Sequence, residues 1–364
     1  MADIFERLIK NYGPIGQHRE RAHGYFAFPK LEGEIGSKMM FRGQEMIVWS
    51  LNNYLGLANH PEVRKADADA SAKYGLALPM GARMMSGNSD LHEQLEAELA
   101  SFENKEDAIL MNYGYQGIMS AIDAICGRHD VVVYDAECHA CIIDGLRMLP
   151  GHRFVYKHND VEDCEKQLHR AQALIEKQQS GGILVITEGV FGMAGDQGKL
   201  MEIVDLKSKV PFRMLVDDAH GFGVLGDNGA GVLQHFNLSS PQLIYMGTLG
   251  KAAGVSGAFV AAHEHFIEWM VQRSRPYIYT TAAVPALAHA LLTSLRFIRG
   301  EEGQRRRSHL NALIQQLSTA PVPASWTRLH SITPIQPMVL GSNAQVLKAS
   351  AELHKQGIWI SAIR

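Results

Sequence analysis

Residues 243–262, LIYMGTLGKAAGVSGAFVAA, determine how the rest of the chain is interpreted. The run LIYMGT has the apolar, β-branched and aromatic composition of a buried strand. Gly250, Lys251 and several small residues follow it, which leaves room for a bulky planar ligand beside the lysine amine. Burial lowers the pKa of a lysine because a low dielectric penalises the ammonium form, and a neutral amine is a Schiff-base nucleophile. A lysine after a strand is a solvated surface residue as often as it is a buried, reactive one. Other segments of the sequence must therefore decide between these two interpretations.

The composition is that of a globular protein with a large core. The chain has 364 residues, 46% of them hydrophobic, which is enough for one large domain and a smaller one. A net charge of −3 gives no reason to expect nucleic acid or an acidic membrane surface as a partner. No apolar run of 18 residues occurs and the N-terminal residues are charged throughout, so we expect a soluble, cytoplasmic protein without a membrane span or signal peptide.

Strand-like and helix-like segments alternate along most of the chain. The apolar runs AILMNYG, DVVVYDAE, GGILVITEGVF and FRMLVDDAHGFG are separated by helical segments such as VEDCEKQLHRAQALIEKQQ. Apolar strands separated by helices predict an α/β fold, with a mainly parallel sheet covered by helices on both faces. Ligands bind such sheets beyond the carboxyl ends of the strands. In this sequence those ends carry Gly114, Tyr115, His139, Glu188, Asp217, His220 and Lys251, which favours a functional lysine.

Changes in composition predict three parts of the chain. Residues 1–47 form a turn-rich N-terminal segment, residues 48–285 a large domain that carries Lys251 and the other strand-end residues, and residues 286–364 a smaller C-terminal α+β domain. The last part contains a long helical stretch, a second helix and the strand-like run GIWISAIR. Because the chain stops as that strand begins, we expect the small domain to be truncated at Arg364.

Three other motifs have competing interpretations. Residues 221–226 match the dinucleotide-binding pattern G-x-G-x-x-G, but loop-forming residues follow where a helix is needed, so we reject a dinucleotide site. Cys138 and Cys141 form a C-x-x-C motif, which is compatible with a redox pair or half of a zinc site, but no second pair exists among the four cysteines. Asp217 and His220 could be two metal ligands, yet no convincing third is found, and we expect no metal.

Taken together, the motifs resemble those of the α-oxoamine synthases, which are pyridoxal-phosphate enzymes of fold type I. The resemblance is carried by NNYLGLANHP, SGNSDLHEQLE, DAECHACIIDGL, TEGVFGMAGD, VDDAHGFGVLG and GTLGKAAGVSG, and it covers nearly the whole chain. The last third is most similar to the branch that makes 8-amino-7-oxononanoate in biotin synthesis. The first two thirds look more like serine palmitoyltransferase-like relatives.

The resemblance implies roles for the residues at the strand ends. Lys251 would form the Schiff base with pyridoxal phosphate, Asp217 would hold the pyridine nitrogen, and His220 would meet the phenolic oxygen. His139 would stack on the ring. The catalytic set would thus be Lys251, His139, Asp217 and His220.

Further positions match cofactor or substrate contacts of the family. The phosphate would be bound by the backbone of Gly114 and Tyr115, by Thr248, and by Thr281 across a homodimer interface. Asn52 and Arg364 would bind the amino-acid substrate. Gly192 departs from the pattern, because the family usually has a serine there that bonds to a cofactor oxygen.

The implied activity is that of a homodimeric acyltransferase. It would condense an amino acid with an acyl thioester, carried by CoA or an acyl carrier protein, and release CO2. The preferred pair is L-alanine with a pimeloyl thioester. Alternatives are a serine palmitoyltransferase-like or glycine C-acetyltransferase-like reaction, or a truncated chain that holds cofactor without turnover.

Overall fold

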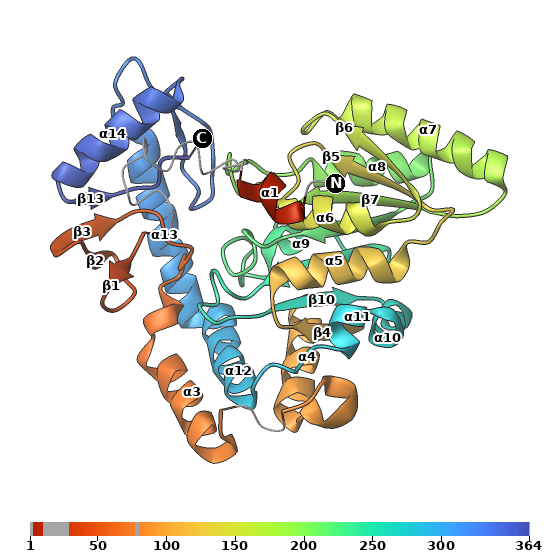
Figure 1. Ribbon diagram of the computed structural model, residues 1–364, viewed down its shortest axis with the longest axis horizontal. Helices are drawn as coiled ribbons and strands as arrows, with labels where there is room; N and C mark the ends of the chain where they lie inside the picture. Colours follow the sequence, from red (N-terminus) through yellow and green to blue (C-terminus); the bar gives the residue numbers. More distant parts are fainter. Residues whose placement is uncertain (1–2, 10–28, 77–79, 364) are drawn as a thin grey trace. The chain divides into compact units, whose positions relative to one another are not determined.

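The computed structural model describes residues 3–9, 29–76 and 80–363, which belong to two compact units (Figure 1). The smaller unit is Met1–Leu51 with Leu340–Arg364, and the larger unit is Asn52–Val339. Each unit is a group of residues that make more contacts with one another than with the rest of the chain. The predicted domain boundaries after residues 47 and 285 stay predictions.

A seven-stranded sheet forms the centre of the larger unit. In spatial order its strands are β4 (Asp107–Met111), β10 (Ala258–Ala262), β9 (Leu243–Thr248), β8 (Arg213–Asp217), β7 (Ile183–Glu188), β5 (Val131–Asp135) and β6 (His152–Tyr156). All neighbours are parallel except β10, which is antiparallel to β4 and β9. The connection 249–257 is too short for the crossover that a parallel pair requires. The predicted mainly parallel α/β sheet is confirmed.

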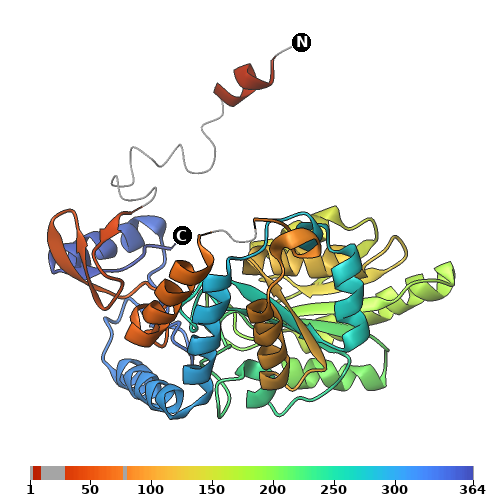
Figure 2. The same ribbon diagram turned by 90° about the horizontal axis from the view of Figure 1, so that it is seen from below.

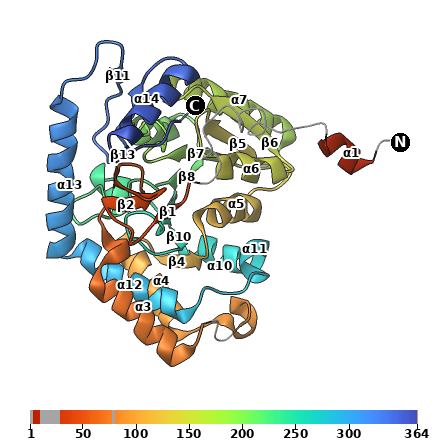
Figure 3. The ribbon, with the colours of Figure 1, turned by 60° about the vertical axis from the view of Figure 1, so that its left-hand side comes forward.

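Helices cover both faces of this sheet because its strands are apolar on both sides. One face carries α5 (Gly114–Ile125), α6 (Ala140–Met148) and α10 (Glu264–Arg273), and α11 (Arg275–Ile278) packs on α5. The other carries α4 (Asp90–Phe102), α7 (Val161–Gln178), α8 (Leu200–Asp205), α9 (Gly231–His235) and α12 (Pro285–Arg299). Successive residues of β5 show the division, since Val131 and Val133 belong to one core and Val132 to the other. Figure 3 shows α10 and α11 close to α5.

Further helices complete the larger unit. The helix α3 (Pro61–Tyr74) packs along α12, as Figure 2 shows, and α13 (Glu301–Thr319) follows α12. Short segments are η1 (Leu57–Asn59), the π-helix η2 (Arg83–Gly87), η3 (Leu206–Ser208) and the strand pair β11 (Thr327–Arg328) and β12 (Met338–Val339).

The smaller unit is built from both ends of the chain. Strands β1 (Leu31–Glu32), β2 (Lys38–Phe41) and β3 (Gln44–Val48) form a sheet to which β13 (Ile358–Trp359) adds in parallel. The helix α14 (Asn343–Lys355) precedes β13 in the chain, and the short helix α1 (Ile4–Ile9) precedes β1. The strand that GIWISAIR predicts therefore forms, and its partner is β3. None of the described helices has the length and apolar character needed to cross a bilayer.

Candidate active site

Lys251 lies in the turn that follows β9, where its amine meets a histidine from the turn after β8. Its Nζ is 2.9 Å from Nε2 of His220. The turn is held by Gly254, whose N–H donates to the Lys251 carbonyl at 3.0 Å, and by Ser294 of α12, whose hydroxyl donates to the Ala253 carbonyl at 2.6 Å. Burial lowers the pKa of Lys251, against the opposing effect of Asp217 and Glu188.

His220 is half-buried and has a partner on each ring nitrogen. Its Nδ1 is 2.7 Å from the hydroxyl of Tyr54. Burial, and then the positive charges of Lys251 and His139, lower the pKa of His220 to about 3. The imidazole is therefore neutral at physiological pH.

Asp217 ends β8 and is buried, with 4% of its surface exposed. Its Oδ1 accepts a hydrogen bond from the Ala219 N–H at 3.0 Å. Burial raises the pKa of this carboxyl, although Lys251 and His139 favour its charged form. Glu188 lies opposite Asp217 in the β7–β8 register, and burial together with the Asp217 charge raises the pKa of Glu188 to about 8. Because both carboxyls share a low-dielectric site, one of them tends to hold a proton.

His139 caps the N-terminus of α6 and is exposed. Its backbone N–H donates to Oε1 of Glu188 at 2.5 Å, and its Nδ1 lies 3.0 Å from Sγ of Cys141. The same Sγ is 4.0 Å from Oδ2 of Asp217. The ring of Tyr115 stands edge-on to the His139 ring, with centroids 6.0 Å apart. His139, Cys141, Glu188 and Asp217 therefore form one cluster beside Lys251.

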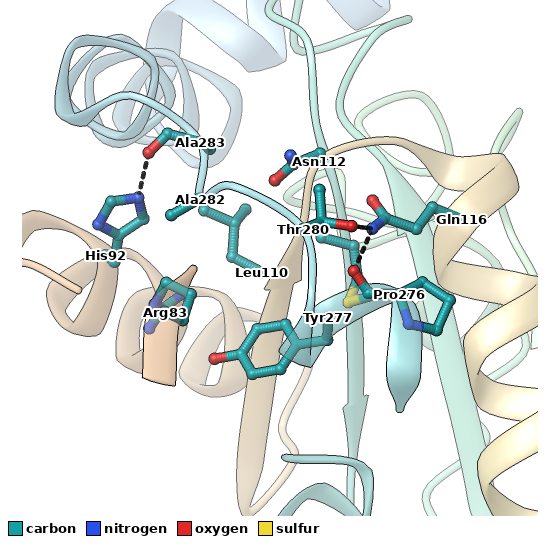
Figure 4. A pocket seen from close by; sticks show the side chains of 11 residues that line it. Arg83, His92, Leu110, Asn112, Gln116, Pro276, Tyr277, Thr280, Ala282 and Ala283 are labelled. Atoms are coloured by element: carbon teal, nitrogen blue, oxygen red, sulfur yellow. Dashed lines mark hydrogen bonds between the residues drawn. The ribbon is translucent and has the colours of Figure 1, made fainter. Parts of the chain in front are cut away.

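Gly114 and Thr248, two of the predicted phosphate-binding residues, meet at the start of α5. Gly114 opens this helix, and a Cβ added there would lie 2.5 Å from Oγ1 of Thr248. Thr281 is exposed, and its carbonyl accepts a hydrogen bond from Asn112 Nδ2 at 2.9 Å. The neighbouring Thr280 is 3.3 Å from Nε2 of Gln116, which also donates to the Pro276 carbonyl at 2.7 Å (Figure 4). The segment that carries Thr281 is thus tied to β4 and α5.

The two predicted substrate residues are placed differently. Asn52 is exposed, and its Oδ1 is 3.4 Å from the hydroxyl of Tyr54. Arg364 lies outside the described residues, so its predicted role stays a prediction.

Three residues of the site have no role in the sequence-based prediction. Glu188 is noticed there only as a strand-end residue, and Cys141 only as part of a C-x-x-C motif. Tyr54 stands two residues after Asn52 in NNYLGL, which is the only signal that points to it. The structure leaves all four cysteines free and buried, and the described residues include no group of three or more His, Cys, Asp or Glu side chains arranged for a metal ion.

The residues at these strand ends fit pyridoxal phosphate. The N-terminus of α5 offers backbone N–H groups to a phosphate, and the missing side chain of Gly114 leaves space beside Thr248. At Gly192 an added Cβ would lie 2.7 Å from His220 Nε2, so this glycine keeps the imidazole accessible. The set also supplies an amine that burial shifts toward its neutral form and a buried carboxyl, the groups that such a cofactor requires.

Known proteins are similar to this chain in sequence and in fold. The family model Aminotransferase class I and II matches residues 44–364. A cysteate-C-fatty acyltransferase from Capnocytophaga ochracea is 52% identical over 295 residues, which are 79% of this chain and 70% of that protein. An 8-amino-7-oxononanoate synthase from Janthinobacterium sp. is 43% identical over 337 residues, 92% of this chain and 84% of that protein.

Solved structures similar to this chain include enzymes of the same kind as these sequence relatives. A serine palmitoyltransferase from S. paucimobilis, solved with bound PLP and myriocin, superposes with a TM-score of 0.87 at 26% identity, covering 99% of this chain and 92% of that one. An 8-amino-7-oxononanoate synthase from Francisella tularensis has a TM-score of 0.69 at 27% identity, covering 87% and 88%. The chain therefore belongs to the α-oxoamine synthases of the class I and II aminotransferase family, and it is an acyltransferase that uses pyridoxal phosphate.

Proposed function

We propose that this protein condenses an α-amino acid with an acyl thioester and releases CO2, with Lys251, Asp217, His220 and His139 as its catalytic residues. The observation that carries the proposal is the 2.9 Å contact between Lys251 Nζ and His220, formed beside the buried Asp217. Such convergence at the carboxyl ends of neighbouring parallel strands is where α/β proteins bind ligands.

In this proposal each cofactor group has a residue to hold it. Lys251 would bind the aldehyde carbon, Asp217 the pyridine nitrogen, and His220 the phenolic oxygen, while His139 would cover one ring face. The phosphate would lie at Gly114, Tyr115 and Thr248. When bound, the cofactor supplies an electron sink for the negative charge that develops on the substrate.

The chain's own groups would then move and hold protons. The Lys251 amine would remove a proton from the amino acid, a role that its lowered pKa supports. The Asp217 carboxylate would keep a proton on the ring nitrogen. Glu188 supports this division, because a protonated Glu188 beside it leaves the negative charge on Asp217.

L-Alanine with a pimeloyl thioester is our first candidate for the substrates, which would give 8-amino-7-oxononanoate for biotin synthesis. Relatives of that name that are 39–43% identical and span up to the whole chain support it. Asn52 and Arg364 would bind the amino acid. CoA and carrier-protein thioesters are cytoplasmic molecules, so we propose that the enzyme acts in the cytoplasm.

A second candidate is cysteate with a fatty acyl thioester. It is favoured by the 52% identity to a cysteate-C-fatty acyltransferase, although that match covers a smaller share of the chain. The two candidates differ in the charge of the amino-acid side chain and in the length of the acyl chain, so they are separable by assay.

We also propose a homodimer in which Thr281 reaches the cofactor phosphate of the partner subunit. Thr281 forms a β-bridge with Ala82, and large apolar side chains are exposed on both sides of this bridge. Tyr279 lies two residues before Thr281, and the segment around Ala82 carries Leu76, Met80, Met84 and Met85. A concentration of such side chains is typical of a protein interface.

Two experiments test the function. Borohydride reduction of the cofactor-loaded protein, followed by peptide mapping, should attach the cofactor to Lys251; attachment to another lysine would contradict the assignment. Thioester consumption should then be measured for alanine, serine, glycine and cysteate, each with pimeloyl and palmitoyl thioesters. We expect the highest kcat/KM for alanine with pimeloyl thioester, whereas a preference for cysteate with palmitoyl thioester would select the second candidate.

A further inference from the structure

A tyrosine hydroxyl and a lysine amine lie on opposite sides of the same imidazole. Tyr54 Oη is 2.7 Å from His220 Nδ1, and Lys251 Nζ is 2.9 Å from His220 Nε2. Tyr54 comes from the segment before η1, far from the other two residues in sequence. His220 therefore connects the amine to a hydroxyl that does not itself reach Lys251.

Only one nitrogen of His220 carries a hydrogen. Burial and neighbouring positive charge keep the ring neutral, and a neutral imidazole donates through one nitrogen and accepts through the other. Which nitrogen carries the hydrogen is decided by the partners of the two nitrogens. The Tyr54 hydroxyl is thus able to influence what Nε2 offers to Lys251.

A protonated Lys251 sets the direction of the hydrogen bonds, because an ammonium group can only donate. His220 Nε2 is then the acceptor at 2.9 Å, so the one hydrogen of the neutral imidazole is on Nδ1. The Tyr54 hydroxyl accepts this Nδ1–H at 2.7 Å, and its own hydrogen is free to point to Oδ1 of Asn52, 3.4 Å away.

We infer that Tyr54 is a positioning residue, which holds His220 in the Nδ1-protonated tautomer and thereby raises the proton affinity of Lys251. The inference rests on the proposed role of Lys251 and extends it. The base strength of the amine then depends on the Tyr54 hydroxyl, which acts on Lys251 only through His220. Without the hydroxyl, a buried Nδ1–H would lack its partner, and the hydrogen would move to Nε2. An Nε2–H cannot accept from an ammonium group, so the neutral amine would be favoured.

Other ionisable groups also act on the two side chains. Those around Lys251 and His220 are Asp217, Glu188, Cys141, Asp218 and His139. All of them are retained when only the Tyr54 hydroxyl is removed. A difference between the wild type and Tyr54→Phe therefore isolates the hydroxyl, since phenylalanine keeps the ring.

The test measures Lys251 in the full chain after removal of the cofactor. Competitive acetylation of Lys251 as a function of pH gives its titration midpoint, and nitrogen NMR of labelled histidine gives the tautomer of His220. For Tyr54→Phe we expect the midpoint to fall by about one pH unit, a tenfold loss of proton affinity. His220 should shift from the Nδ1-protonated to the Nε2-protonated form. Tyr74→Phe, at another half-buried tyrosine, should change neither.

Three outcomes would overturn the inference: an unchanged midpoint in Tyr54→Phe, a midpoint that rises, or a wild-type His220 protonated on Nε2. The last is measured without any variant. Reconstituted Tyr54→Phe should also have a kcat profile displaced to lower pH with little change in KM. Failure of this inference is distinguishable from failure of the proposed function. Cofactor trapping on another lysine would refute the catalytic role of Lys251, whereas the titration of Lys251 tests only the effect of the Tyr54 hydroxyl.

Discussion

Two consecutive aspartates at the end of β8 have different surroundings. Asp217 lies beside Cys141 and Lys251, whereas Asp218 accepts hydrogen bonds from the Tyr245 hydroxyl and the Val232 N–H, both at 2.8 Å. Both side chains are buried. Successive residues of a strand point to opposite faces, so one aspartate belongs to the proposed site and the other to the packing behind it.

This division predicts different defects in two isosteric variants. Asp217→Asn should fold normally but lose about 10²–10³-fold in turnover, because a neutral amide cannot hold the charge of a protonated ring. Asp218→Asn should keep turnover and lose about 1–3 kcal/mol of stability through its weakened buried hydrogen bonds. Steady-state kinetics and thermal unfolding measure the two effects. A larger loss of turnover in Asp218→Asn would contradict the assignment.

Glu188 should make stability depend on pH. Its pKa rises from an ordinary value of 4.5 to about 8, because of burial and the neighbouring Asp217. The folded protein then holds a proton that the unfolded chain releases, so the free energy of unfolding falls as pH rises from about 4.5 through about 8. A glutamine at this position cannot ionise. In Glu188→Gln the free energy of unfolding should therefore fall by about 3–5 kcal/mol less than in the wild type over the same pH range.

Denaturant unfolding of the cofactor-free protein across this range measures the effect. Glu162→Gln, at an exposed position in the first turn of α7, is the control and should leave the pH dependence unchanged. Parallel curves for the wild type and Glu188→Gln would show that Glu188 is already ionised in the folded protein.

At the scale of elements, the lysine turn is pressed against η1. Gly254 has a φ of +71°, and a Cβ there would lie 2.3 Å from the backbone nitrogen of Ala58. Gly75, which caps α3, has a similar φ of +79° but has nothing within 4 Å of an added Cβ. Both glycines have a positive φ, but only Gly254 lies close to the backbone of another segment.

Gly75→Ala should cost about 1–3 kcal/mol, because a φ of +79° with a ψ of −177° is a backbone conformation essentially confined to glycine. Gly254→Ala should cost clearly more, because the backbone of η1 must also move, and it should displace Lys251 and weaken cofactor binding. Chemical denaturation and cofactor titration measure these effects. Equal losses of stability in the two variants would mean that the close contact does not constrain the turn.

A largely buried ion pair joins η2 to α4, with 9% of the Arg83 side chain and 13% of the Glu96 side chain exposed. Arg83 and Glu96 form two hydrogen bonds of 2.9 and 2.8 Å, and Oε1 of Glu96 also accepts the Leu110 N–H of β4. Glu96→Gln would leave a buried guanidinium without its counter-charge, so we expect a loss of about 3–5 kcal/mol. The exposed pair Lys65–Asp69 is the control, and Asp69→Asn should cost less than about 1 kcal/mol. Similar unfolding free energies for both variants would contradict this expectation.

At the scale of the whole molecule, the proposed homodimer would draw one site from two subunits. Lys251→Ala and Thr281→Glu should each be nearly inactive, the second because a carboxylate repels the partner's cofactor phosphate. Mixing the two variants should restore activity, since one site of the mixed dimer then has both native residues. A mixture of Lys251→Ala and Asp217→Asn should restore nothing, because both residues belong to one subunit's site. A single-chain mass in sedimentation, or no restoration in the first mixture, would refute shared sites.

The sequence by itself determined the α/β class and the mainly parallel sheet. Apolar strands separated by helices, with chemically active residues at the strand ends, were sufficient because periodicity and composition report burial and local conformation directly. The same pattern placed Lys251, Asp217 and His220 at the strand ends, where the structure has them. Their roles, and those of Thr281, Asn52 and Arg364, stay predictions.

Only the tertiary structure decided which distant residues meet. The contact of Tyr54 with His220 spans 166 positions, and the pairing of Glu188 with Asp217 depends on the register of β7 and β8. The antiparallel direction of β10 likewise follows from how the short lysine turn returns into the sheet. Local patterns show that a residue is buried but not which neighbour it has, because that neighbour is set by strand order and register, to which the whole chain contributes.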